Sequence, residues 1–266
     1  MNNEKWFQGY KALKKKLNIS RELKKFRKDP MEPFFRLLDK EQEFTLFADD
    51  IYRYREAYNF FYLSLTRFLL EMSIAVRWSN GPYYVRKSRG KYSESQRKLA
   101  NKYNAISKYL AYDFFNCILH SRILMDKTIG LSRYFITNNQ LPSFTSFNNH
   151  KKFFKKLKEN NEELEQFEDY ARCIREETDW FDIPLKIVRD KYLVHAGPKH
   201  MRFFGFPGIG HELSLVVVLP AGDEEKKPLS KVNCISVSIP QLANDIQIFL
   251  IWFSNYGINC LEKRRT

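Results

Sequence analysis

The chain has 266 residues, of which 44% are hydrophobic and 16% aromatic, so it is long enough to bury a core and too apolar for a disordered protein. Its formal net charge of +14 favours a polyanionic partner or an anionic membrane surface. No apolar run reaches the roughly 18 residues of a membrane-spanning helix, and no apolar core follows the charged N-terminus as in a signal peptide. We therefore expect a cytoplasmic protein without membrane insertion.

Residues 1–28 carry ten basic side chains against two acidic ones, which is more than half of the net charge of the chain. Apolar residues recur there at helical spacing and predict a basic amphipathic helix. The apolar stripe consists of Trp6, Tyr10, Leu13 and Leu17. Three roles fit this pattern: a solvated helix that packs its stripe on the core, a patch for RNA phosphates, and a helix on a membrane surface.

A 3-4-3-4 spacing of apolar residues predicts one long helix that begins at about Phe44 and ends near Asn80, before Gly81 and Pro82. Its stripe consists of Phe44, Phe47, Ile51, Tyr54, Tyr58, Phe61, Leu65, Phe68 and Met72. Because aromatic side chains crowd the seam of a two-helix coiled coil, we expect a helix of an intramolecular bundle.

Ser93 and Gln96 form a capping-box pattern that predicts a second long helix, which continues to about Thr137. Polar residues follow one stripe of this helix and its edge. They are Asp113, Asn116, His120 and Lys127, with Arg122 and Asp126 beside them. This stripe is either a solvent face with intrahelical salt bridges or a polar face turned toward residues 189–195. A third, charged helix is predicted from about His150 to Glu176.

Beyond Gly197 and Pro198 the pattern changes from helix to strand. Two short apolar runs, 213–219 and 232–239, predict a β-hairpin, and Ser238 begins the capping pattern of a last helix. The predicted fold is therefore all-α, a helical bundle of four to six helices with a small β-hairpin inserted before the C-terminal helix.

In chain order, we expect three parts. They are a basic N-terminal helical extension (1–33), a helical bundle (34–200), and a hairpin with a C-terminal helix that packs on the bundle (201–266).

The segment from Arg189 through Asp190 to His195 combines a permanent cation, a carboxylate and a side chain that titrates near neutral pH. It follows apolar residues at helical spacing and precedes Gly197, so it is predicted as the end of a buried helix. This combination suits phosphodiester chemistry without a metal. The structural alternative is that Arg189 and Asp190 form ion pairs within the bundle while His195 stabilises the helix C-terminus.

This segment resembles the signature of the HEPN superfamily, in which an Arg is followed directly by a polar residue and, after four to six intervening residues, by a His. Arg189, Asp190 and His195 match these three places. The resemblance covers roughly residues 40–200 and implies an all-α bundle. It also implies a metal-independent endoribonuclease, of a type that acts as a toxin, in phage defence or in RNA processing.

By the same resemblance, His195 is a general acid or base, Arg189 stabilises charge on the phosphorane, and Asp190 orients one of them. Lys191, Tyr192, His120 and Arg122 are candidate contacts to the RNA substrate, and the structural alternative for Tyr192 is packing in the core. The resemblance further implies a homodimer with a composite active site and an antitoxin protein as a possible partner. The alternative function is a non-catalytic HEPN module that binds RNA, a nucleotide or a protein.

Other chemistries lack their motifs. The chain has no P-loop, no dinucleotide fingerprint and no zinc pattern, so we expect no metal and no cofactor. The four cysteines are Cys117, Cys173, Cys234 and Cys260. They are far apart in the sequence, and we expect reduced thiols of which three or four are buried.

Overall fold

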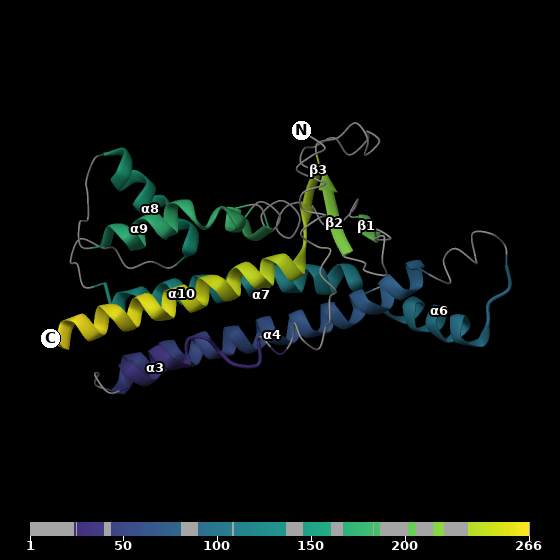
Figure 1. The fold of residues 1–266 in the computed structure, drawn as a ribbon, viewed down its shortest axis with the longest axis horizontal. Coiled ribbons are helices and arrows are strands. Elements are labelled where there is room, and N and C mark those ends of the chain that lie inside the picture. The colour runs from purple at the N-terminus through teal and green to yellow at the C-terminus, as the bar shows by residue number, and fades with distance from the viewer. Residues whose placement is uncertain are drawn as a thin grey trace. The chain divides into compact units, whose positions relative to one another are not determined.

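The computed structural model describes residues 24, 26–39, 44–80, 90–107, 109–136, 146–160, 167–182, 184–186, 202–205, 215–220 and 234–265. Most of these residues are helical, in agreement with the predicted all-α class (Figure 1). The helices are α3 (Glu32–Leu38), α4 (Phe44–Asn80), α6 (Glu94–Ile106), α7 (Leu110–Gly130), η1 (Leu131–Tyr134), α8 (Phe147–Glu159), α9 (Glu168–Glu176), η3 (Asp179–Phe181) and α10 (Ile239–Arg265). Within the described part of the chain, none of them has an apolar stretch that could span a membrane.

Two compact units divide the chain. The first contains the described residues of 1–27, 64–117 and 192–240, and the second those of 28–63, 118–191 and 241–266. Each unit is assembled from segments that are far apart in the sequence. The three parts predicted by chain order stay a prediction.

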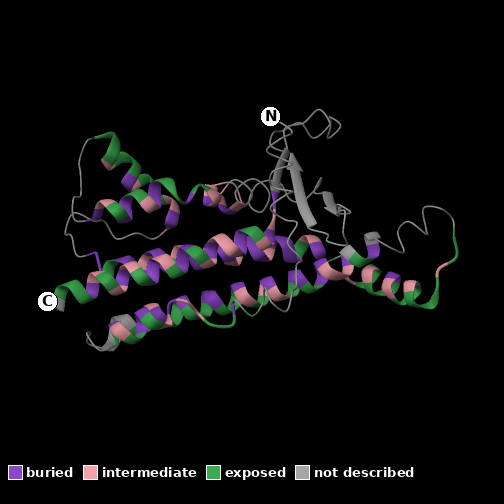
Figure 2. Cartoon of the chain, viewed as in Figure 1, coloured by how far each residue is buried: buried purple, intermediate pink, exposed green. Residues whose placement is uncertain are grey.

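Helix α4 confirms the predicted long helix, and it ends at Asn80 as the sequence indicates. Its periodic apolar side chains are buried wherever they are described, from Ile51 and Tyr54 to Phe68 and Met72. Figure 2 shows the resulting alternation of buried and exposed residues along this helix. The predicted basic helix within residues 1–28 lies almost entirely outside the described residues.

The predicted second helix is wrong in its length, because two helices occupy this range. The capping box at its start is confirmed: Gln96 N–H donates to Ser93 Oγ (3.3 Å), and Ser93 N–H donates to Gln96 Oε1 (2.9 Å). Helix α6 nevertheless ends at Ile106. The Ser107 hydroxyl donates to the carbonyl oxygen of Asn104 (3.1 Å), a local bond that competes with helix continuation.

The predicted third helix is also wrong as a single element. Helix α8 ends at Glu159 and is followed by Asn160, whereas α9 begins only after Phe167, whose φ of −130° is not helical. The short helix α3 was missed, because two prolines at its start hid the apolar pattern. The backbone at its start is held by Asp29, whose carboxylate accepts the Met31 N–H (2.9 Å).

Aromatic side chains form the core of the second unit, where α3, α7, α8, α9 and α10 meet. Phe135 contacts Phe34, Tyr170 and Phe253 with ring centroids 5.8, 5.8 and 5.1 Å away. The rings approach α10 so closely that a Cβ on Gly257 would lie 2.6 Å from an atom of Phe34. A glycine is therefore required at this contact for steric reasons.

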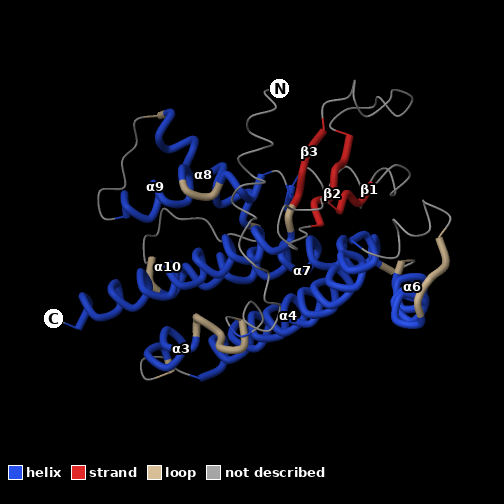
Figure 3. The backbone as a smooth tube through the Cα atoms, turned by 45° about the vertical axis from the view of Figure 1, so that its right-hand side comes forward, coloured by secondary structure: helices blue, strands red, loops and turns tan. Residues whose placement is uncertain are grey.

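The strands lie in the first unit as an antiparallel sheet with the order β1-β2-β3 (Figure 3). The strands are β1 (Arg202–Gly205), β2 (Leu215–Pro220) and β3 (Cys234–Val237). Val217 pairs with Phe203 on one side and with Val237 on the other. Strand β3 lies within the predicted run 232–239, and β2 overlaps the run 213–219 and ends one residue beyond it, whereas β1 was not predicted. Helix α10 follows β3 directly and begins at Ile239, next to the predicted cap at Ser238.

Candidate functional site

The predicted catalytic residues Arg189, Asp190 and His195 lie outside the described residues, as do Lys191 and Tyr192. Their mutual geometry therefore stays a prediction. The segment that leads to them is described as far as Lys186. Phe181 and Leu185 are fully buried there, as the apolar spacing predicts, but the backbone forms a 3-10 turn (η3) and a π-helical turn at 184–186.

A buried lysine of α8 holds this leading segment in place. Lys151 Nζ donates to the carbonyl oxygen of Thr178 (3.1 Å), to Asp179 (3.1 Å) and to Asp182 (2.9 Å). Its side chain is only 4% exposed. Sequence reasoning missed this residue, although Lys151 occupies an apolar position of α8, three to four residues from buried Phe147 and Phe154.

Arg122 of α7 contacts the same segment from another side. Its guanidinium lies 4.5 Å from the centre of the Phe181 ring and pairs with Asp126 (3.1 Å). Asp126 in turn accepts the Phe147 N–H (2.7 Å) at the start of α8. Arg122 is thus buried in the core, and the prediction of a solvent face is wrong at this position. Its role as a substrate contact stays a prediction.

His120, the other candidate contact on α7, is half-buried. Its ring stacks on Phe60 with centroids 5.4 Å apart, and burial lowers its pKa. The solvent-face prediction is also wrong for Asp113, which is 2% exposed, while Lys127 is exposed as expected. A substrate role for His120 is an untested prediction.

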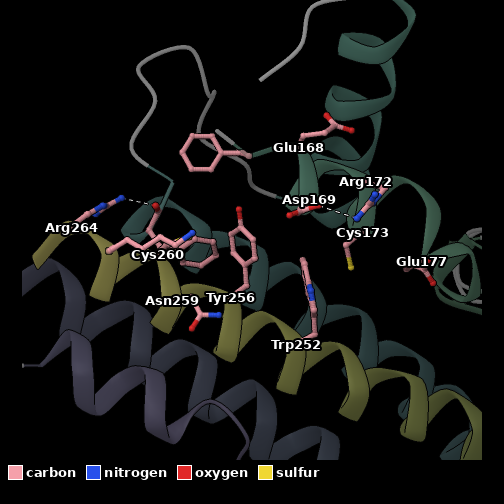
Figure 4. A pocket seen from close by; sticks show the side chains of 13 residues that line it. Glu168, Asp169, Arg172, Cys173, Glu177, Trp252, Tyr256, Asn259, Cys260 and Arg264 are labelled. Atoms are coloured by element: carbon pink, nitrogen blue, oxygen red, sulfur yellow. Dashed lines mark hydrogen bonds and ion pairs between the residues drawn. The ribbon is translucent and has the colours of Figure 1, made fainter. Parts of the chain in front are cut away.

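The second unit also has a hollow of about 1000 Å³ between one face of α9 and one face of α10. Figure 4 shows Trp252 and Tyr256 rising from α10 toward α9, which contributes Asp169, Arg172 and Cys173. Arg172 and Cys173 follow Asp169 by three and four positions, and Tyr256 follows Trp252 by four, so each set shares one helix face. Sequence reasoning did not find this hollow.

The thiols in the hollow are protonated at neutral pH. Burial raises the pKa of Cys173 to about 12, and it raises the pKa of Cys260 as well. Cys117, Cys173 and Cys260 are free thiols, but only Cys117 is fully buried. The expectation that three or four cysteines are buried is therefore wrong for two of the three described. The side chain of Cys234 lies outside the described residues.

The first unit contains a buried pair of carboxyl groups. Arg67 Nε lies 2.7 Å from Asp113 Oδ2 and 3.6 Å from Glu71 Oε1. The pKa of Glu71 is raised to about 8, first by burial and then by the hydrogen bond to Asp113 and the charge of Asp113, while Arg67 opposes the rise. The pair therefore holds a proton near neutral pH. Among the described residues, no group of three or more His, Cys, Asp or Glu side chains is placed to hold a metal ion.

Comparisons with protein-family models, with curated proteins and with solved structures gave no match to this chain. The resemblance to the HEPN superfamily accordingly depends on the motif at residues 189–195 and on its helical surroundings in the sequence.

Proposed function

We propose that this chain is a metal-independent endoribonuclease of HEPN type, acting as a toxin or a phage-defence effector in the cytoplasm. The observation that carries the proposal is the order of Arg189, Asp190 and His195, directly after a segment whose Phe181 and Leu185 are buried. The net charge of +14 supports an RNA substrate, because Lys and Arg side chains attract phosphates without regard to sequence.

The proposed chemistry is an attack of the ribose 2′-OH on the adjacent phosphorus. His195 takes the proton from the 2′-OH or gives one to the leaving 5′-oxygen, a role worth about 10²–10⁴-fold in rate. Arg189 places its planar guanidinium against the charge that develops on the phosphorane. Asp190 orients Arg189 or His195, and Lys191 and Tyr192 contact the substrate. The products are a 2′,3′-cyclic phosphate and a 5′-hydroxyl.

The motif favours a homodimer with a composite site. Six positions along an ideal helix turn by about 600°, which leaves Arg189 and His195 some 120° apart on one chain. A second protomer that contributes its own motif completes the cleft. An antitoxin protein that covers this cleft is the partner by analogy with related toxin pairs. The HEPN-like bundle and its inserted hairpin belong to the same proposal.

The test uses purified full-length protein and two matched oligonucleotides in EDTA, one of RNA and one with 2′-deoxyribose at every position. We expect cleavage of the RNA alone, with cyclic-phosphate ends detected by mass spectrometry. Cleavage of the deoxy substrate, or a strict requirement for added Mg²⁺, would contradict the proposed chemistry.

The non-catalytic alternative predicts a different result in the same assay. A module that only binds RNA would show affinity that falls steeply with salt concentration and no product under any condition.

A further inference from the structure

Helix α8 carries five lysines in 13 residues, against one acidic residue, Glu159. Two of these lysines have carboxylate partners. Lys151 is buried and pairs with two aspartates of the segment that leads to the predicted motif. Lys158 Nζ lies 3.0 Å from Glu176 Oε1 of α9. These two lysines therefore stabilise the packing of the second unit.

The other three lysines of α8 are exposed. They are Lys152, Lys155 and Lys156, and together we call them the lysine face. With 3.6 residues per turn, the three positions fall within a sector of about 100° around the helix axis, so they share one side of α8. Among the described residues, none supplies a hydrogen-bond or ion-pair partner to any of the three. The lysine face thus differs from the two compensated lysines of the same helix.

The acidic residues of the neighbouring helix α9 do not neutralise the lysine face. Glu168 and Asp169 pair with arginines of α9 itself, at 2.7 and 2.9 Å, and Glu176 pairs with Lys158. Each of the three acidic side chains of α9 therefore has another cation as its partner. Within the described part of the chain, the lysine face presents uncompensated positive charge to solvent.

This arrangement suits a chain of phosphates. Side chains three and four positions apart on a helix have Cβ atoms about 5–6 Å apart, so a flexible strand can place successive phosphates against them. A membrane surface fits less well, because a helix that lies on a membrane needs an exposed apolar face. Phe147 and Phe154 of α8 are fully buried, and none of the large exposed apolar side chains among the described residues belongs to α8.

We propose that the lysine face of α8 binds the phosphate backbone of single-stranded RNA. Lysine contacts to phosphates do not distinguish RNA from DNA, so the choice of RNA rests on the proposed ribonuclease function. Lys151 fixes Asp182 from the buried side of α8. Seven positions separate Asp182 from Arg189, which the chain can span by at most about 25 Å. A strand bound to α8 can therefore extend to the motif.

The experiment measures binding of a short, fluorescently labelled single-stranded RNA to full-length His195→Ala, which should bind without cleaving. Anisotropy is recorded in EDTA between about 0.05 and 0.2 M KCl. Each phosphate contact to a single strand contributes about −0.7 to the slope of log K against log salt concentration. Changing all three lysines of the lysine face to Gln should therefore make the slope less negative by about 2. Binding at about 0.1 M salt should weaken at least about tenfold.

The matched control is a triple Gln variant of Arg97, Lys98 and Lys102, which removes the same charge from exposed positions of α6 in the first unit. This variant should keep the slope of its parent, and circular dichroism should show that both triple variants are folded. Equal changes of slope in the two variants would overturn the proposal, because RNA affinity would then follow net charge alone. Binding to phosphatidylserine vesicles without binding to RNA would also overturn it.

Failure of this proposal differs from failure of the proposed function. In the chain that retains His195, loss of the lysine face should raise KM for RNA cleavage at least about tenfold and leave kcat unchanged, because these lysines do not touch the reacting atoms. RNA binding that requires the lysine face, without any cleavage in EDTA, would support the surface and contradict the ribonuclease. Cleavage with an unchanged KM and salt slope in the lysine-face variant would overturn the surface alone.

Discussion

The two units of the molecule differ in how far their buried charged groups are compensated by neighbours of opposite charge. In the second unit, one buried cation, Lys151, meets two carboxylates, Asp179 and Asp182. In the first unit, two buried carboxyl groups, Glu71 and Asp113, share Arg67, whose side chain is 55% exposed. The cation of the second unit is thus compensated by two carboxylates. The carboxyl pair of the first unit is compensated only in part, so it keeps a proton.

Asp29 of the second unit shows what decides between these outcomes. Its pKa is raised only to about 6, because the Met31 N–H and the Tyr54 hydroxyl donate to its carboxylate and oppose the rise that burial causes. Asp29 also has a carboxylate neighbour, Glu32, but Glu71 is hydrogen-bonded to its neighbour Asp113, and its pKa rises to about 8. The chemical nature of the neighbours, rather than burial alone, sets the protonation state of a buried carboxyl group here.

Reversing the charge of Lys151 should have the largest effect. Lys151→Glu places a third carboxylate beside Asp179 and Asp182 in a buried position and should cost at least about 3–5 kcal/mol in the free energy of unfolding. Urea denaturation followed by circular dichroism measures this loss. Lys155→Glu on the exposed face of α8 makes the same charge change and should cost less than about 0.5 kcal/mol. Equal losses in the two variants would mean that the buried cluster is unimportant.

Glu71→Gln should remove a pH dependence from the first unit. The folded-state pKa of about 8 lies above the usual 4.5, so the folded chain holds a proton that the unfolded chain has released between these values. Glu71 therefore stabilises the fold fully below about pH 4.5, and stability falls by up to about 1.4 kcal/mol per pH unit as the pH rises to about 8. Gln, which carries no charge, abolishes this fall.

The measurement is the free energy of unfolding of wild type and Glu71→Gln at pH 5 and at pH 8. Relative to wild type, the free energy of unfolding of Glu71→Gln should be higher at pH 8 than at pH 5. Glu94→Gln is the control, because this glutamate is exposed and paired with Lys98. Parallel pH profiles for wild type and Glu71→Gln would show that the carboxyl pair holds no proton.

Asp29→Asn should have the smallest effect of the three. The folded-state pKa of about 6 exceeds the usual 3.8, so stability falls over a narrower window, between about pH 3.8 and 6. Asn retains an oxygen that accepts from Met31 and Tyr54, so the start of α3 should persist. The free energy of unfolding should differ less between pH 4 and pH 6 in Asp29→Asn than in wild type. A variant that unfolds at both pH values would show that the charge, and not the hydrogen bonds, is required.

The sequence predicted the helices that depend on interactions between residues close together in the chain. The apolar spacing from Ile51 to Met72 and the stop after Asn80 define α4, and Ser93 with Gln96 defines the start of α6. The break after Ile106 was not predictable from periodicity, because it involves a single hydroxyl bond from Ser107.

The candidate sites were less accessible to sequence reasoning. The hollow combines Cys173 of α9 with Cys260 of α10, and only tertiary packing brings such distant residues together. Lys151 looked like one of many surface lysines, since its carboxylate partners lie 28 and 31 residues further along the chain. The motif at 189–195 was found because its residues are contiguous in the sequence.

The most direct test of the proposed function is RNA cleavage in EDTA by His195→Ala and by a control variant, His211→Ala, whose histidine lies outside the motif at 189–195. The proposal predicts that His195→Ala loses cleavage by about 10²-fold or more, that it still binds RNA, and that His211→Ala cleaves like wild type. Cleavage by purified His195→Ala at the wild-type rate would contradict the assignment of this histidine and, with it, the proposed catalytic site.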